Sequence, residues 1–292
     1  MSPPDATASM EGFSLKPPTI THEDLLILGA DAFMDDAVAV VTGAGSGIGQ
    51  ATCLALSANG VTVVGFDIDP EGLAETTALV ESFDLGGDHH EVTADLTDDT
   101  AIDAAIETAS EVGQLGYLLN IAGMQHIASI AEFPMDRYEL LMNLMVRAPW
   151  YLTKRMMPHF EEGSGGVIAN MSSIHGHVAT QDKGAYITAK HALNGLTKAI
   201  AAEGEGAIRS FTISVGYVLT PLMVDQIEST ARSRGISERA VVEDVMLGPA
   251  QTKRMMTPAE VANLFVFGLS DHGEHLNGGD LLWDGGFTTT YD

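Results

Sequence analysis

Short apolar runs alternate with longer amphipathic stretches along most of the chain. Apolar runs of four to eight residues predict buried strands, whereas apolar positions repeated every three or four residues predict helices. We expect strands at 38–43, 61–67, 90–96, 117–123, 166–173, 210–217 and 279–286. We expect helices at 47–60, 70–83, 99–113, 137–157 and 185–204. This alternation predicts an α/β fold, a doubly wound parallel seven-stranded sheet with helices on both faces.

The first 34 residues depart from this pattern. Four prolines interrupt a polar stretch, which is followed by the apolar run LLILGA at 25–30. We expect residues 1–34 to form an N-terminal extension, either an ordered arm or a partly disordered tail. Residues 35–292 are long enough for one large domain with a single core.

Charge and composition narrow the possible partners. Acidic residues outnumber basic ones by 40 to 14, for a net charge of −26, which disfavours nucleic acid and anionic membranes as partners. No apolar run reaches the roughly 18 residues of a membrane span, and the first residues lack a signal-peptide pattern. The single Cys53 excludes an intrachain disulfide, so we expect a cytoplasmic protein.

The same charge suggests a salt-adapted, halophilic origin. Only six lysines are present, while acidic residues are plentiful on segments expected to be exposed. Such a surface stays hydrated at molar salt, where screening removes its self-repulsion. The alternative is an ordinary acidic enzyme.

A glycine-rich turn, TGAGSGIG at 42–49, joins the first predicted strand to the first helix. Glycines permit a tight turn and let a pyrophosphate approach the backbone N–H groups at the helix N-terminus. The predicted contacts are Gly43, Ser46, Gly47, Ile48 and Gly49.

The second predicted strand ends at Asp67, about twenty residues after the glycines. A carboxylate at this place accepts hydrogen bonds from a ribose 2′-hydroxyl and repels a 2′-phosphate. No arginine lies nearby, so we predict NAD rather than NADP as the cofactor. Asp69 is the second candidate for this role.

Tyr186 and Lys190 lie one helical turn apart in AYITAK, and Ser173 precedes the tyrosine by thirteen residues. The four-residue spacing places the phenol and the ammonium group on one helix face. Nearby positive charge is expected to lower the pKa of the phenol, which then serves as a general acid and base. Ser173, at a strand end, would polarise a carbonyl.

The glycine spacing and the Ser–Tyr–Lys order together resemble the short-chain dehydrogenase/reductase family over residues 37–287 and its Rossmann-type fold. The resemblance favours Ser173 over Ser172, and it implies that Asn143 bends its helix and anchors a proton-relay water. It also implies that Lys190 binds the nicotinamide ribose, that residues 221–250 form a substrate lid, and that the protein is a homotetramer. The further cofactor contacts that it implies are Asp95, Asn120, Gly123, Tyr186 and Thr220.

Three stretches are similar to the D-3-hydroxybutyrate dehydrogenases of this family: GMQH at 123–126, SIHG at 173–176 with the run from Lys183, and TPLMVDQI at 220–227. In that branch the matching residues hold the substrate, here Gln125, His175, Lys183, Tyr217 and Gln226. Tyr217 stands where the branch usually has tryptophan, and Leu219 where arginine is frequent. A tyrosine could admit a longer acid or a polyol.

The leading hypothesis is therefore an NAD-dependent oxidoreductase that interconverts (R)-3-hydroxybutyrate and acetoacetate. An alternative is a short-chain dehydrogenase for a sugar, a polyol or another hydroxy acid. A third hypothesis is a catalytically silent NAD-binding regulatory or assembly protein. The histidines of HGH at 175–177 lack the neighbouring acidic or cysteine ligands that a metal site needs, so no metal is expected.

Overall fold

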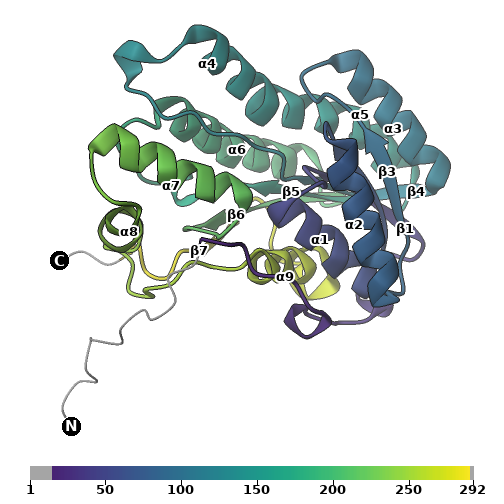
Figure 1. Cartoon of the computed structure of the whole chain (residues 1–292). Coiled ribbons are helices and arrows are strands. Elements are labelled where there is room, and N and C mark those ends of the chain that lie inside the picture. The colour runs from purple at the N-terminus through teal and green to yellow at the C-terminus, as the bar shows by residue number, and fades with distance from the viewer. Residues whose placement is uncertain (1–14, 290–292) are drawn as a thin grey trace.

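The computed structural model describes residues 15–289 and contains a seven-stranded parallel sheet with helices on both faces (Figure 1). This confirms the fold class expected from the sequence. The strand order is β3-β2-β1-β4-β5-β6-β7. The strands are β1 (Ala37–Thr42), β2 (Thr62–Asp67), β3 (His89–Thr93), β4 (Gln114–Asn120), β5 (Gly166–Met171), β6 (Ile208–Val215) and β7 (Asp280–Trp283).

Two apolar clusters, one on each side of the sheet, form the core. On one side β1, β4, β5 and β6 pack against α1, α2 and α9, and on the other side the sheet packs against α3, α5 and α6. These helices and the remaining ones are α1 (Gly47–Ala58), α2 (Pro70–Phe83), α3 (Asp99–Val112), α4 (Met135–Met142), α5 (Ala148–Glu162), α6 (Gly184–Glu203), α7 (Pro221–Arg234), α8 (Glu238–Ala240) and α9 (Pro258–Leu269). No helix of residues 15–289 is both long and apolar enough to cross a membrane.

The helix expected at 137–157 is in fact two helices joined by a π-helical turn. α4 ends at Met142, the turn η4 spans Asn143–Arg147, and α5 then runs to Glu162. A π turn inserts an extra residue, so it changes which side chains face inward on its two sides. The bend comes at the asparagine that the sequence analysis had singled out.

The helix α9 was not expected from the sequence. Its N-terminus carries a capping box, in which Thr257 Oγ1 accepts from the N–H of Glu260 and a Glu260 carboxylate oxygen accepts from the N–H of Thr257. The helix carries apolar residues on most sides, and these are buried against α1 and the sheet. An all-round apolar helix has no clear amphipathic period, which hides it from a pattern search.

The described part of the N-terminal extension, residues 15–34, packs on the chain's own core. Leu25 and Phe33 are buried, and the backbone around them is tied by Asn59 at the end of α1. Asn59 Oδ1 accepts from the N–H groups of Leu28 (2.6 Å) and Gly29 (3.1 Å), and its Nδ2 donates to the carbonyl of Leu26 (2.8 Å). Residues 1–14 lie outside the described residues, and the boundary at residue 34 stays an interpretation.

We predict that Asn59→Ala lowers the free energy of unfolding by about 2–4 kcal/mol, because it leaves several buried backbone groups without partners. Urea unfolding followed by circular dichroism measures this change. The control is Thr108→Ala on the exposed face of α3, expected to change stability by about 0.5 kcal/mol or less. Equal effects of the two substitutions would mean that residues 25–30 do not depend on Asn59.

Candidate active site

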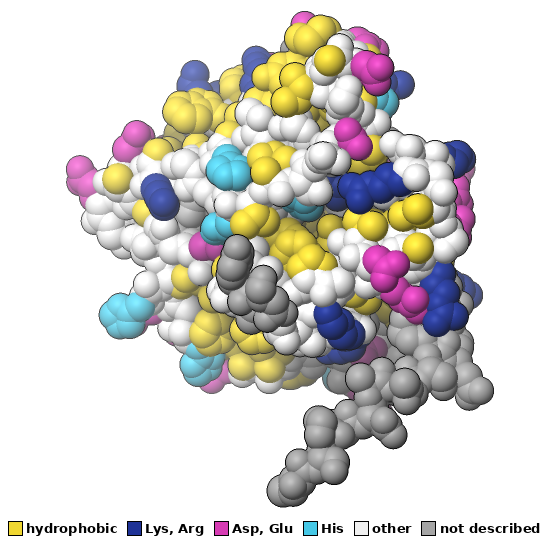
Figure 2. All heavy atoms as spheres, turned by 90° about the vertical axis from the view of Figure 1, so that its left-hand side faces the viewer, with side chains coloured by type: hydrophobic (Ala, Val, Ile, Leu, Met, Phe, Trp, Pro, Cys, Tyr) yellow, Lys and Arg dark blue, Asp and Glu magenta, His cyan; other side chains and the backbone are white. Residues whose placement is uncertain are grey.

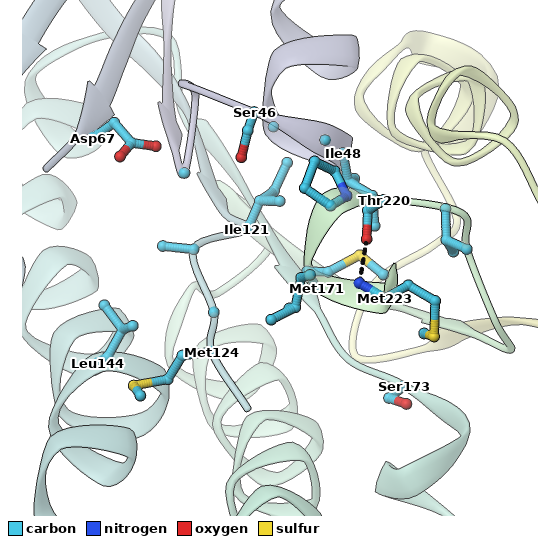
Figure 3. A pocket seen from close by; sticks show the side chains of 18 of the residues that line it. Ser46, Ile48, Asp67, Ile121, Met124, Leu144, Met171, Ser173, Thr220 and Met223 are labelled. Atoms are coloured by element: carbon cyan, nitrogen blue, oxygen red, sulfur yellow. Dashed lines mark hydrogen bonds between the residues drawn. The ribbon is translucent and has the colours of Figure 1, made fainter. Parts of the chain in front are cut away.

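A cavity of about 480 Å³ lies at the carboxyl ends of the strands, between the glycine turn, the end of β5 and α7. In a doubly wound sheet this edge is where ligands bind, beside the point at which the strand order reverses. Figure 3 shows side chains from both halves of the sheet around it. The predicted site residues that line it are Gly43, Ser46, Gly47, Ile48, Gly49, Asp67, Asp95, Gly123, Ser173, Tyr186, Lys190, Thr220 and Gln226.

The face of the molecule that carries α4 and α7 is less acidic than a net charge of −26 would suggest. Figure 2 shows the side on which α4 and α7 lie, with apolar side chains over much of the face and acidic ones scattered among basic ones. A continuous acidic layer would repel an anionic ligand, and this face carries none in that view.

The glycine turn is packed too closely for side chains at two positions. Gly43 has φ +72°, and a Cβ there would lie 2.9 Å from Ala122 Cα. A Cβ on Gly49 would overlap the carbonyl oxygen of Gly43. The turn therefore brings bare backbone to the N-terminus of α1, a geometry that fits a pyrophosphate.

Asp67 lies at the end of β2 and faces the turn. Its Oδ2 accepts from the N–H of Gly45 (2.9 Å) and its Oδ1 from the N–H of Asp69 (3.0 Å). Asp69 instead caps α2 by accepting from the N–H of Glu71 (3.1 Å), and it does not line the cavity. Of the two candidate carboxylates, Asp67 is thus the one that lines the cavity.

Two further predicted cofactor contacts have different surroundings. Thr220 caps α7 by accepting from the N–H of Met223 (3.3 Å), as Figure 3 shows, and faces the glycine turn. Asn120 is buried and does not line the cavity. Its Nδ2 donates to Asn170 Oδ1 (2.8 Å), so its described contact joins β4 to β5.

Lys190 and Tyr186 project from α6 towards the end of β5. The ammonium group of Lys190 donates to the carbonyl of Met171 (2.7 Å) and lies 5.3 Å from the centroid of the Tyr186 ring. Burial lowers the pKa of Lys190 to about 8. This short distance agrees with the four-residue spacing, which places the phenol and the ammonium group on one face of α6.

The pKa of Tyr186 is raised in the structure, whereas the sequence analysis expected nearby positive charge to lower it. Burial raises the pKa of Tyr186 to about 12, although a hydrogen bond with the Ser173 hydroxyl opposes that rise. The sequence shows which groups are near the phenol but not how little water reaches it. In the chain alone, the cost of removing the phenolate from water affects the pKa more than the hydrogen bond with Ser173 does.

Ser173 lies two residues after the end of β5 and is the serine that contacts Tyr186. The hydroxyl of the competing Ser172 donates to Asn194 Oδ1 (2.7 Å) on α6, so it is already engaged. The neighbourhood thus favours Ser173 as the group that faces a substrate oxygen.

Asn143 does not occupy the place expected for a proton-relay residue. Its side chain is exposed and does not line the cavity. The buried side chain of this segment is Met145, which packs in the cluster containing Tyr186 and has its sulfur close to Gly123. A thioether cannot anchor a water as an amide does. Leu141 and Met145 are four residues apart, a helical signal that would have put Asn143 on the outer face.

Of the predicted substrate residues, Gln226 lines the main cavity, whereas Gln125, His175, Lys183 and Tyr217 do not, and Lys183 lies directly before α6. Lys183 is 8 % exposed and donates to Gln226 Oε1 (3.4 Å), and its ammonium group lies 5.6 Å from the Tyr217 ring centroid. Burial and the charge of Arg234 lower the pKa of Lys183 to about 8. Lys183, Tyr217 and Arg234 line a small second cavity.

Gln125 presents a buried donor that lacks a partner. Its Oε1 accepts from the N–H of His126 (3.0 Å), while its Nε2 is buried and has no hydrogen-bond partner among residues 15–289. An unpaired buried amide costs free energy, on the order of 1–3 kcal/mol, and a ligand oxygen would remove that cost. Sequence reasoning identified the residue but not this orientation.

The two histidines of HGH point to different partners. His175 is buried beside Ser173, whereas His177 Nε2 lies 3.0 Å from Asp280 Oδ2 on β7. Within residues 15–289, no group of three or more histidine, cysteine or acidic side chains is placed to hold a metal ion.

Comparison with known proteins gives the family. The family model described as "Enoyl-(Acyl carrier protein) reductase" matches residues 43–288. A D-beta-hydroxybutyrate dehydrogenase of Rhizobium meliloti (strain 1021) is 35 % identical over 254 residues, covering 86 % of this chain and 98 % of the relative. A D-threitol dehydrogenase of Mycolicibacterium smegmatis is 31 % identical over 274 residues, covering 92 % and 99 %.

Solved structures agree with the sequence relatives. Levodione reductase superposes with a TM-score of 0.82 at 26 % identity, covering 88 % of this chain and 99 % of that one. A putative NAD(P)-dependent gluconate 5-dehydrogenase from Beutenbergia cavernae, with bound NADP at low occupancy, gives 0.77 at 28 % identity, covering 87 % and 97 %. The chain is therefore an NAD(P)-dependent oxidoreductase that belongs to the short-chain dehydrogenase/reductase family.

Proposed function

We propose that the protein is an NAD-dependent dehydrogenase that interconverts (R)-3-hydroxybutyrate and acetoacetate. The observation that carries the proposal is the buried Lys183, whose ammonium group donates to Gln226, a residue that lines the main cavity. A buried ammonium group without an anionic partner is costly, and a substrate carboxylate would supply that partner. The D-beta-hydroxybutyrate dehydrogenase relative supports the same choice.

The neighbouring amides fit this anion. The Gln226 oxygen is engaged by Lys183, which leaves its amide N–H groups for a ligand, and Gln125 Nε2 has no partner. A four-carbon acid has little apolar surface, so charge-assisted hydrogen bonds must provide most of its affinity. One ammonium group and two amides are suitable donors for that purpose.

The chain's own groups then handle the proton. A bound nicotinamide would accept or supply the hydride at the substrate carbon. In the oxidation direction Tyr186 takes the hydroxyl proton, and in the reduction direction it returns that proton to the developing alkoxide. Ser173 donates a hydrogen bond to the same substrate oxygen, and Lys190 supplies positive charge beside the phenol. The apolar wall made by Met145 and its neighbours excludes water from this step.

Asp67 is proposed to select NAD, because its carboxylate lies at the glycine turn where a 2′-phosphate would add negative charge. We predict that Asp67→Ser lowers kcat/KM with NAD about tenfold or more and raises it with NADP. Initial rates with the two cofactors measure this. Asp69→Ser removes a carboxylate two residues away, outside the cavity, and serves as the control. An unchanged NAD/NADP ratio in Asp67→Ser would contradict the assignment.

A sugar, polyol or other hydroxy acid is the second candidate substrate class. Tyr217 favours it, because its hydroxyl adds a polar group beside Lys183, and the D-threitol dehydrogenase relative acts on a polyol by name. The two candidates differ in whether the substrate is charged. A silent regulatory or assembly role is the third reading, and NAD reduction with any alcohol would contradict it.

Lys183→Met separates the two substrate classes. We predict that KM for 3-hydroxybutyrate rises about 100-fold while kinetics with a neutral polyol stay the same, since a loss of about 2–3 kcal/mol falls only on an anion. The control is Lys198→Met, an exposed lysine on the same helix. Unchanged KM for every hydroxy acid tested would contradict the carboxylate site.

The proposal also covers the substrate lid, the oligomeric state and the location of the protein. The segment 221–250 folds as α7, α8 and the π-helical η6 (Val241–Met246), and it brings Gln226 to the cleft, which supports its role as a substrate lid. We also propose a homotetramer, from the family resemblance, and a cytoplasmic location, from the single Cys53 of the sequence.

Salt adaptation is also proposed, from the net charge of −26. We predict that the apparent Tm rises by several degrees between low salt and about 2 M KCl, because screening relieves repulsion among exposed carboxylates. Differential scanning calorimetry measures it, with an equimolar sucrose series as the control for a general cosolvent effect. A Tm that is flat or falling with salt would exclude the idea.

A further inference from the structure

The segment that carries Ser173 is tied to α6 by one side chain, Asn194. Asn194 Oδ1 accepts from the hydroxyl of Ser172 (2.7 Å), and its Nδ2 donates to the backbone carbonyl of Gly176 (3.1 Å). Ser172 directly precedes Ser173, and the N–H of Gly176 donates to the carbonyl of Ser173 (2.8 Å). One amide group therefore bonds to the chain on both sides of the serine that contacts Tyr186.

The orientation of the Asn194 amide follows from its two partners. A backbone carbonyl only accepts hydrogen bonds, so the atom of the amide that faces Gly176 must be the nitrogen. The oxygen then faces Ser172, whose hydroxyl donates to it. Neither an amide nor a serine hydroxyl titrates in the working pH range of an enzyme, so both bonds hold at any pH where the protein is folded.

The turn after Ser173 packs directly against this amide. Ser172 is 1 % exposed, and Asn194 is half-buried. A Cβ added to Gly176 would lie 2.7 Å from Ser172 Oγ and 2.8 Å from Asn194 Nδ2. A side chain at position 176 would therefore displace the two polar groups, and the bare glycine backbone lets the turn approach α6 closely enough for both hydrogen bonds.

Asn194 lies on the helix that carries the predicted catalytic groups. Tyr186, Lys190 and Asn194 follow one another at four-residue intervals on α6, which places them on one side of the helix. The Ser173 hydroxyl and the Tyr186 phenol come from two different elements, and both must reach the same substrate oxygen. A misplacement of about 1 Å can cost about 100-fold in rate, so the separation of these two elements matters.

We propose that Asn194 is a positioning residue for the reaction, which fixes the Ser173 segment against α6 so that the Ser173 hydroxyl and the Tyr186 phenol meet at one substrate oxygen. Asn194 does not line the main cavity, so it acts through Ser173 and not on the substrate. This inference rests on the proposed dehydrogenase function. It does not depend on which alcohol is the substrate, because every alcohol presents the same kind of oxygen to the two groups.

Two substitutions in the full-length enzyme test the proposal. Asn194→Leu removes both hydrogen bonds and keeps a similar volume, and Ser172→Ala removes one of them. We expect Asn194→Leu to slow single-turnover NADH formation from (R)-3-hydroxybutyrate about 10- to 100-fold. KM and the affinity for NAD should change by less than about threefold, because neither binding site is altered. Ser172→Ala should slow the same step about three- to tenfold.

Thr197→Val is the matched control on the same helix. Thr197 is 1 % exposed, and its hydroxyl accepts from Asn170 Nδ2 (2.8 Å), so it also joins α6 to β5 by a buried hydrogen bond. We expect Thr197→Val to lower the Tm about as much as Asn194→Leu does and to leave the single-turnover rate within about twofold. Equal losses of rate in the two variants would mean that Asn194 only holds the helix to the sheet, and would overturn the inference.

A double-mutant cycle with Ser173→Ala shows whether Asn194 acts through Ser173. If it does, Asn194→Leu costs about twofold or less in the Ser173→Ala background. The same loss in both backgrounds, or a raised KM with an unchanged single-turnover rate, would overturn the inference. Should Asn194→Leu fail to fold, Ser172→Ala in the same cycle decides.

Failure of the proposed function gives a different result. A wild type that oxidises a polyol but not 3-hydroxybutyrate contradicts the proposed substrate alone, and the same variants are then compared with that polyol. A wild type that oxidises no alcohol contradicts the proposed function, and this inference with it.

Discussion

The buried ammonium group of Lys190, bonded to the Met171 carbonyl beside the Tyr186 ring, is the contact on which the site depends. Taking a cation out of water is costly, and the low pKa of Lys190 records that cost. The same burial raises the pKa of the phenol. Burial thus moves the two pKa values apart, to about 12 for the Tyr186 phenol and about 8 for the Lys190 ammonium group, so in the chain alone the phenol keeps its proton.

The parallel sheet makes this placement possible. β5 delivers Met171 and Ser173 to the carboxyl edge, α6 crosses it with Tyr186 and Lys190, and β1 supplies the glycine turn on the other side. The wall towards α4 and α5 is apolar at Met145, so polar support for the phenol comes from the β5 side. The polar side chain that contacts the phenol from that side is Ser173.

The sequence predicted most of the fold, because each strand is a short apolar run and the helix 70–83 has a clear amphipathic period. It missed α9, which is apolar on most sides, and it gave one continuous helix, bent at Asn143, where a π turn divides α4 from α5. At the site, spacing identified Tyr186, Lys190 and Asp67. The side chain of Asn143 is exposed and outside the cavity because its direction depends on helix phase, and the pKa of Tyr186 is raised instead of lowered because depth of burial is a tertiary property.

The most direct test of the account is the pH dependence of single-turnover NADH formation, followed at 340 nm, in the wild type and in Tyr186→Phe. The substrate is whichever alcohol a panel of hydroxy acids and polyols shows to be oxidised. Loss of a positioned general base should slow the Phe variant about 100-fold or more at every pH, with NAD binding retained. A Phe variant that forms NADH at the wild-type rate would show that the buried phenol is not the acid and base of this enzyme.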